Sequence, residues 1–241
     1  MTALMLHGIM KYRPCGPSLP PDVVMLRSGT LLGVCSAFVP THANLAEDER
    51  VESEVSAALN HHDILCTISK THDIAPIRFG SVFSSERALR ADIHEKTSLY
   101  GETLERLRGH QELALALTAD GRTGQVAEGR TTYSRPSGRD YLQARRGAKA
   151  RREDLSAQRE AFAERTVAQF CLTATQTTQA PDRRGRLVAT SLLVARDRAA
   201  DLCHAARALE EDAASLGLQL TLKGPWPPYS FCEKTHELAN G

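Results

Sequence analysis

The 241-residue chain lacks a charge excess of either sign, and it lacks any long apolar run. Its 30 Lys and Arg residues are balanced by 29 Asp and Glu residues. The chain as a whole therefore has no field that would hold nucleic acid or an anionic membrane by net charge. No run reaches the ~18 apolar residues expected of a membrane-spanning helix. Binding to a phosphate polymer would need a local basic cluster.

Catalytic and phosphate-binding motifs are also missing. The patterns G-x-x-x-x-G-K-[ST] and G-x-G-x-x-G do not occur, and the run from Gly80 to Phe83 is not the G-x-S-x-G turn of a nucleophilic serine. The six cysteines are dispersed without a C-x-x-C pair: Cys15, Cys35, Cys66, Cys171, Cys203 and Cys232. We therefore expect free thiols in a reducing, cytoplasmic compartment, no catalytic residues and no cofactor.

The densest group of potential metal ligands consists of His61, His62, Asp63, His72 and Asp73. Adjacent histidines point to different faces of a helix, and no third ligand follows at the i+4 spacing of a zinc-protease helix. We expect no metal site here.

The first 111 residues are predicted to form one α/β domain. From Glu47 the apolar residues Val51, Val55, Ala58 and Leu59 recur at helical spacing and predict an amphipathic helix. The other expected elements are a strand over residues 4–10, a hairpin of residues 23–26 and 31–39 around Ser28-Gly29, an edge strand over residues 74–79 marked by Pro76, and a helix from Ser84 or Ser85 to Gly109.

Residues 112–241 are predicted to form the second domain. The patterns give a strand (112–117), a long helix (139–170), two strands (171–179 and 187–194), a helix (196–215) and a last strand (218–222). Long polar segments, 119–138 and 180–185, separate some of them. The order strand, helix, strand, strand, helix, strand is that of a ferredoxin-like βαββαβ unit, with an antiparallel sheet and both helices on one face. The fold class is thus α+β with two α/β domains.

The least generic stretch is residues 224–231, Gly-Pro-Trp-Pro-Pro-Tyr-Ser-Phe, which we call the strap. Its prolines favour extended backbone. Its three rings, Trp226, Tyr229 and Phe231, either close a hydrophobic core or form a partner-binding surface. We expect them to pack on the sheet of the second domain, and we keep them as partner-binding candidates.

A basic cluster in the long predicted helix consists of Arg145, Arg146, Lys149, Arg151 and Arg152. Such a cluster can meet phosphates, so nucleic-acid binding is the alternative function. Glu153, Asp154, Glu160 and Glu164 follow on the same helix, which instead favours a solvated face with i,i+4 ion pairs.

Three blocks of sequence, residues 61–65, 74–83 and 218–231, together resemble the gas vesicle protein F/L family (GvpF/GvpL). The resemblance spans nearly the whole chain. It implies two α/β domains, the second a ferredoxin-like variant, and a non-enzymatic accessory protein needed to assemble the gas-filled shells that give cells buoyancy. It further implies that the chain acts like a chaperone: it binds the hydrophobic major shell protein (GvpA type), alongside other accessory proteins, and limits its aggregation during nucleation. It implies neither nucleic acid nor a lipid membrane as a partner.

Overall fold

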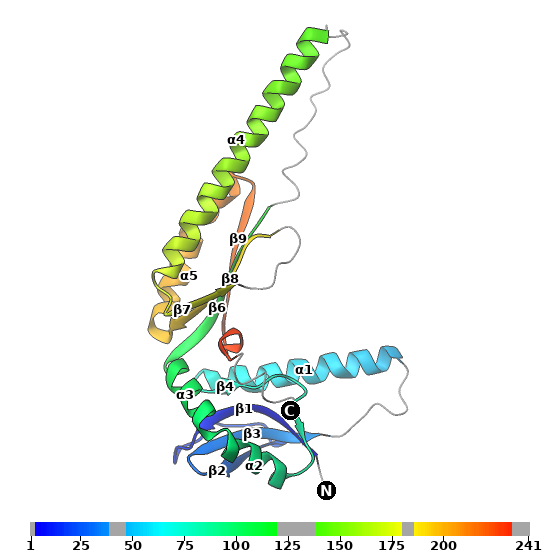
Figure 1. Ribbon diagram of the computed structural model, residues 1–241, viewed down its shortest axis with the longest axis vertical. Helices are drawn as coiled ribbons and strands as arrows, with labels where there is room; N and C mark the ends of the chain where they lie inside the picture. The colour runs from blue at the N-terminus through cyan, green and yellow to red at the C-terminus, as the bar shows by residue number, and fades with distance from the viewer. Residues whose placement is uncertain (1–2, 39–46, 120–137, 180–185, 233–241) are drawn as a thin grey trace. The chain divides into compact units, whose positions relative to one another are not determined.

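The computed structural model describes residues 3–38, 47–119, 138–179 and 186–232 (Figure 1). The predicted polar segments 119–138 and 180–185 lie almost entirely outside these ranges. Contacts divide the chain into two units: Met1–Glu112 together with Pro225–Gly241, and Leu113–Gly224. Both units combine antiparallel strand pairs with helices, so the mixed α/β class is confirmed.

The sheet of the first unit has the strand order β2-β3-β1-β4, and β5 also pairs with β1. Its strands are β1 (Ala3–Lys11), β2 (Val23–Ser28), β3 (Leu31–Phe38), β4 (Ala75–Pro76) and β5 (Val82–Phe83). The predicted hairpin is confirmed: Ser28 pairs with Leu31, and Gly29 between them has φ +60°, a conformation that costs glycine little because it has no Cβ.

Three helices complete the first unit: α1 (Glu47–Ser69), α2 (Glu86–Glu95) and α3 (Thr97–Leu107). Ser85 caps α2, since its Oγ accepts a hydrogen bond from the Ala88 N–H at 3.3 Å. The prediction of a single helix from Ser84 or Ser85 to Gly109 is wrong in one respect, because the structure has two helices there, α2 and α3, with a break at Lys96. There the Thr97 hydroxyl donates to the carbonyls of Ile93 and His94 at 3.0 and 2.8 Å, which offers the backbone a local alternative to the helix.

Only the second half of α1 joins the core of the first unit. His61, Ile64, Leu65 and Ile68 are buried against the sheet. The apolar residues on which the helix was predicted behave differently: Val51, Val55 and Leu59 are between 52% and 59% exposed. The helix is therefore confirmed, but its recognisable apolar stripe is not its core face.

The strand predicted over residues 74–79 shrinks to β4, a two-residue pairing with β1. Pro76 lies on the terminal strand of the sheet, as expected of a residue without a backbone donor. Ile74, Ala75 and Ile77 are buried. This segment is thus packed, and it offers little open edge to a partner.

The second unit carries a four-stranded sheet of order β7-β8-β6-β9. Its elements are β6 (His110–Ala119), α4 (Gly138–Cys171), β7 (Gln176–Gln179), β8 (Arg186–Ala195), η1 (Arg196–Arg198), α5 (Ala199–Ala208), α6 (Glu210–Ser215) and β9 (Leu218–Trp226). Gly217 stands before β9 with φ +63°, the left-handed geometry predicted for a helix end. The sequence of elements agrees with the predicted order, and β7 pairs antiparallel with β8.

One face of this sheet carries the core of the second unit. Leu113, Leu115 and Leu117 alternate along β6 and are all buried, so they share one face. The same cluster contains Phe162 and Phe170 from α4, together with buried residues of α5 and α6. The helices therefore cover a common face, while the complete ferredoxin-like topology stays a prediction.

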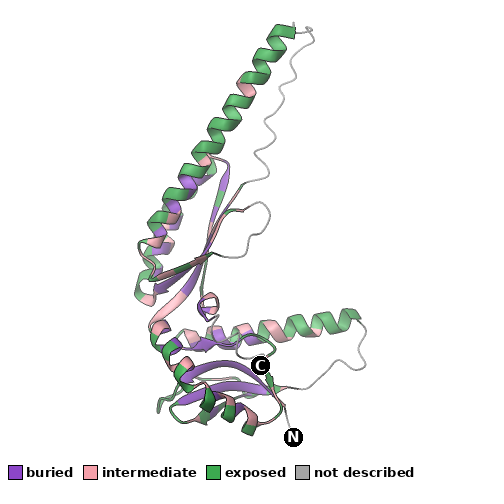
Figure 2. Cartoon of the chain, viewed as in Figure 1, coloured by how far each residue is buried: buried purple, intermediate pink, exposed green. Residues whose placement is uncertain are grey.

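The first half of α4 lies outside that core. Every residue from Gly138 to Arg146 is exposed, and the buried residues of the helix begin at Phe162 (Figure 2). Arg159 marks the transition, because its guanidinium donates to the carbonyls of Leu216 and Gly217 at 2.7 and 3.4 Å. The outer part of α4 is therefore a solvated projection from the second unit.

The strap differs from its prediction in two ways. Its end forms a short 3-10 helix, η2 (Tyr229–Phe231), instead of staying extended. Residues from Pro225 on belong to the first unit, although the predicted second domain was 112–241 and the rings were expected on its sheet. Tyr229 packs instead against the core cluster of the first unit, which includes Met10 and Ile68.

Candidate partner-binding surfaces

Tyr229 is held by a histidine of α1. Its Oη lies 3.0 Å from His62 Nδ1, and the two rings are stacked with centroids 5.8 Å apart. Burial raises the pKa of the Tyr229 hydroxyl, so the group stays protonated as a hydrogen-bonding partner. This ring fixes the strap to the first unit.

Two polar contacts secure the residues that follow. The carboxylate of Glu112, which is 5% exposed, accepts hydrogen bonds from the Ser230 N–H at 2.9 Å and from the Ser230 hydroxyl at 2.6 Å. Arg106 donates to the carbonyl of Phe231 at 2.7 Å. Phe231 itself is buried, and Trp226 is half-buried. Tyr229 and Phe231 thus have structural contacts, while their role in partner binding, and that of Trp226, stays a prediction.

The neighbouring histidines His61 and His62 point to different partners. His61 faces His7, with the two Nδ1 atoms 2.9 Å apart, and its ring meets Phe79 edge-on. His62 faces Tyr229 and also approaches Cys66, whose Sγ lies 3.4 Å from its Nε2. Burial raises the pKa of the Cys66 thiol, which disfavours a reactive thiolate.

The remaining predicted ligands also have other partners. The His72 Nε2 lies 3.3 Å from the carbonyl of Cys15, and the Asp73 carboxylate accepts from the Gly109 N–H at 2.9 Å. Within the described ranges, no three His, Cys, Asp or Glu side chains are grouped so that they could hold a metal ion.

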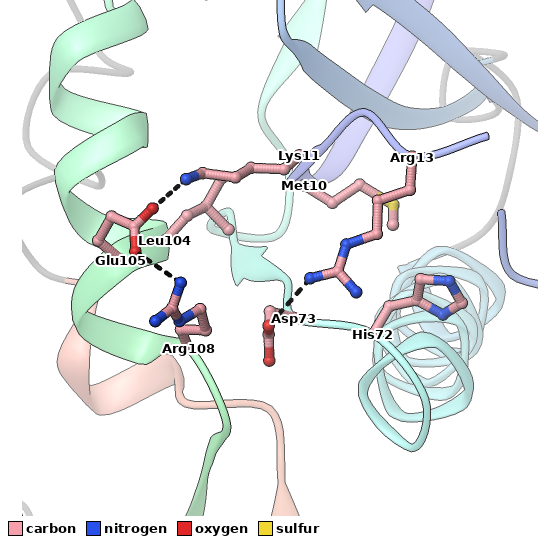
Figure 3. Close-up of a pocket in the computed structure, with 8 residues that line it drawn as sticks. All are labelled: Met10, Lys11, Arg13, His72, Asp73, Leu104, Glu105 and Arg108. Atoms are coloured by element: carbon pink, nitrogen blue, oxygen red, sulfur yellow. Dashed lines mark hydrogen bonds and ion pairs between the residues drawn. The ribbon is translucent and has the colours of Figure 1, made fainter. Parts of the chain in front are cut away.

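A small pocket in the first unit is lined by charged side chains that pair with one another (Figure 3). Lys11 pairs with Glu105, Arg108 lies 3.5 Å from the same carboxylate, and Arg13 lies 3.9 Å from Asp73. The interior volume is about 20 Å³, room for about one water molecule.

An apolar sheet edge is the first of the exposed surfaces that could bind a partner. Strand β2 is terminal in its sheet and, within the residues described, pairs only with β3. Val24 and Met25 are 46% and 37% exposed, and Tyr12 nearby is exposed with its ring under the guanidinium of Arg27 at 3.9 Å. Sequence reasoning missed this edge. Its signal is the unbroken apolar run at 23–26, where an exposed hairpin strand would alternate with polar residues.

The outer parts of α1 and α4 are two further exposed surfaces. We call residues 47–60 of α1 the acidic segment and residues 138–152 of α4 the basic segment. The acidic segment contains five acidic residues and one basic residue, whereas the basic segment contains six basic residues and one acidic residue. Each segment also exposes large apolar side chains, which include Val51 and Tyr141. In the parts of the chain that the structure describes, no helix has the length and apolarity needed to cross a membrane.

Comparisons with known proteins agree on one family. A family model described as gas vesicle synthesis protein GvpL/GvpF matches residues 20–233. Gas vesicle protein L of Streptomyces sp. (strain CB03234) is 27% identical over 234 residues, which cover 88% of this chain and 85% of the relative.

Two crystal structures of gas vesicle protein GvpF share the fold. That of Anabaena sp. PCC7120 superposes with a TM-score of 0.69 at 13% identity and covers 96% of both chains. That of Microcystis aeruginosa gives 0.67 at 14% identity and covers 96% of this chain and 99% of the other. The fold, the strap sequence and the match over most of the chain lead to the same conclusion: the chain belongs to the GvpL/GvpF family of gas vesicle synthesis proteins, and its role is in gas vesicle formation.

Proposed function

We propose that this protein binds the major gas vesicle shell protein in the cytoplasm and keeps it from aggregating before it joins the growing shell. A subunit that coats a gas space must carry a large apolar face, and exposed apolar patches of more than a few hundred Å² drive association. The chain's membership of a gas vesicle synthesis family supports a role in gas vesicle formation. A binder of this kind needs apolar surface and no catalytic group.

The observation that carries the proposal is the open edge of β2. Natural proteins protect edge strands with charges, prolines, bulges or very short strands. Residues 23–26 are Val-Val-Met-Leu and contain neither a charge nor a proline. Six residues of β2 pair with β3 on one side. On the other side the Val23 N–H donates to the carbonyl of Pro20 and the Arg27 carbonyl accepts from Arg90, so an added strand would pair with the stretch between these two residues.

The exposed side chains of this edge suit an apolar partner. Val24 and Met25 are exposed on opposite faces of the strand, and the nearby cation, Arg27, already lies over the Tyr12 ring. Backbone hydrogen bonds would give affinity, and these side chains would contact the apolar partner. The near-zero net charge of the chain would not repel it.

The test is to co-express the gas vesicle genes with a tagged form of this chain and to capture the shell protein on the tag. Val24→Lys with Met25→Lys places two charges on the edge without touching the core, so we expect a folded protein that captures at least tenfold less shell protein. Thr177→Lys with Gln179→Lys in β7, two exposed positions on the terminal strand of the other sheet, is the matched control and should capture normally. Normal vesicles without this chain, together with no capture by the unaltered protein, would refute the proposal.

A further inference from the structure

We propose that copies of this protein associate with one another, and that the acidic segment of α1 in one copy packs lengthwise on the basic segment of α4 in another. The proposal goes beyond shell-protein binding, because it uses different surfaces and a different partner. The partner is a second copy of the chain, which carries both surfaces.

Charge segregation is the first support. The chain as a whole is nearly neutral, with 30 basic and 29 acidic residues. This balance conceals two helix segments of opposite sign. The acidic segment contains Glu47, Asp48, Glu49, Glu52 and Glu54 against Arg50, and the basic segment contains Arg139, Arg145, Arg146, Lys149, Arg151 and Arg152 against Asp140. Opposite charges along two surfaces favour their association and fix its orientation.

Ion pairs along the same helix offset only part of this charge. Arg50 lies 3.7 Å from Glu47, and Lys149 lies 3.6 Å from Glu153, but all four side chains are largely exposed. Exposed i,i+3 and i,i+4 pairs of this kind contribute only a few tenths of a kcal/mol. The carboxylates and cations of the segments can therefore be drawn to stronger partners.

Exposed apolar side chains run beside the charges on both segments. Val51, Val55 and Leu59 follow at i, i+4 and i+8 on α1, and Tyr141 and Leu142 are both more than half exposed on α4. Tyr141, Leu142 and Ala148 lie on one side of α4 together with Arg145, Arg146, Lys149 and Arg152. An apolar stripe flanked by charges is the pattern of a helix that pairs with another helix along its length.

The two segments also match in length. At ~1.5 Å per residue, residues 47–60 extend over about 21 Å and residues 138–152 over about 22 Å. A single contact between two helices of this length is smaller than the roughly 1,200 Å² of a stable interface. The association should therefore be weak, concentration-dependent and sensitive to salt.

The experiment is sedimentation equilibrium of the full chain at low and high salt, between 1 and 100 µM. We expect self-association at low salt and at least tenfold weaker association at high salt. The variant Glu52→Lys with Glu54→Lys should be monomeric over this range, and so should the variant Arg145→Glu with Arg146→Glu. Glu210→Lys with Glu211→Lys, an equal charge change at exposed positions of α6, is the control and should associate like the unaltered protein.

Mixing the two charge variants tests the proposed pairing of segments directly. The first variant reduces the net charge of the acidic segment from −4 to 0, and the second reduces that of the basic segment from +5 to +1, so neither should self-associate. Each variant keeps the segment that the other has altered, so a mixture of the two should form mixed oligomers. Circular dichroism of each variant confirms that it is folded. A monomeric unaltered protein at 100 µM in low salt would overturn the proposal, as would association that survives both reversals or a mixture that stays monomeric. Salt-sensitive binding of a DNA oligonucleotide that requires Arg145 and Arg146, without self-association, would overturn it in favour of a nucleic-acid site.

Discussion

Acid should destabilise the first unit through a histidine of β1. His7 is 0% exposed; its Nδ1 lies 2.9 Å from His61 Nδ1, and its Nε2 lies 3.0 Å from Ser36 Oγ. One Nδ1 of the pair must carry the proton and the other must accept it, so two doubly protonated rings cannot keep this contact. Burial lowers the pKa of His7 to about 4, while the negative charge of Asp22 opposes the shift only partly.

The sign and size of the effect follow from linkage. The pKa of His7 is about 6.5 in the unfolded chain and about 4 in the folded protein. Below pH 6.5 the unfolded chain therefore binds a proton that the folded protein does not, and stability falls until the pH reaches about 4. Between pH 7.5 and pH 4.5 this amounts to a loss of roughly 2–3 kcal/mol in the free energy of unfolding.

The assay is urea unfolding of the unaltered protein and of His7→Gln at pH 7.5 and pH 4.5, followed by circular dichroism. Gln is uncharged at both pH values and can still form hydrogen bonds with Ser36 and His61. Ordinary carboxylates contribute equally to both proteins and cancel in the difference. We expect the free energy of unfolding of the unaltered protein to fall by roughly 2–3 kcal/mol more than that of the variant on acidification. Equal losses in the two proteins would refute the reasoning.

Three further predictions concern stability. Phe231→Ala should lower the free energy of unfolding by roughly 3–5 kcal/mol because the ring is buried, and Trp226→Ala should lower it less because that ring is half-buried. Urea unfolding measures both changes, and equal losses would count against the packing of the strap described above. Gly33→Ala should lower the free energy of unfolding by about 1–3 kcal/mol, since an added Cβ would lie 2.8 Å from Ile93 Cδ1 in the core. An unchanged midpoint of thermal unfolding would show that the core can accommodate the added methyl group. A chelator should leave the thermal midpoint unchanged, and stoichiometric zinc in the purified protein would contradict this.

Much of the fold could be predicted because its signals are local. The hairpin at Gly29, the cap at Ser85 and the turn at Gly217 each follow from the conformational preference or hydrogen-bonding capacity of a single residue. The long helix α4 follows from a run without proline.

The features that were predicted wrongly or missed have a different cause, because they depend on contacts between residues far apart in the sequence. The apolar stripe from Val51 to Leu59 is as regular as a core face, and only the position of the sheet decides that the core begins at His61. The strap gave no local sign of the unit that it packs on, because the partner of Tyr229 stands 167 residues away. The apolar edge at Val24 becomes visible only when the terminal strand of the sheet is known.

The contact between Ser230 and Glu112 has a consequence for synthesis of the chain. The second unit is inserted in the first, and these two residues clamp the points where the chain leaves the first unit and returns to it. During translation, at ~5–20 residues per second, the first unit must wait about 6–24 s between the synthesis of Glu112 and that of Ser230. Until then the core that Tyr229 covers lacks its last piece, and the inserted unit, which ends at Gly224, is complete only six residues earlier. The first unit, whose synthesis begins first, is therefore the last to be completed.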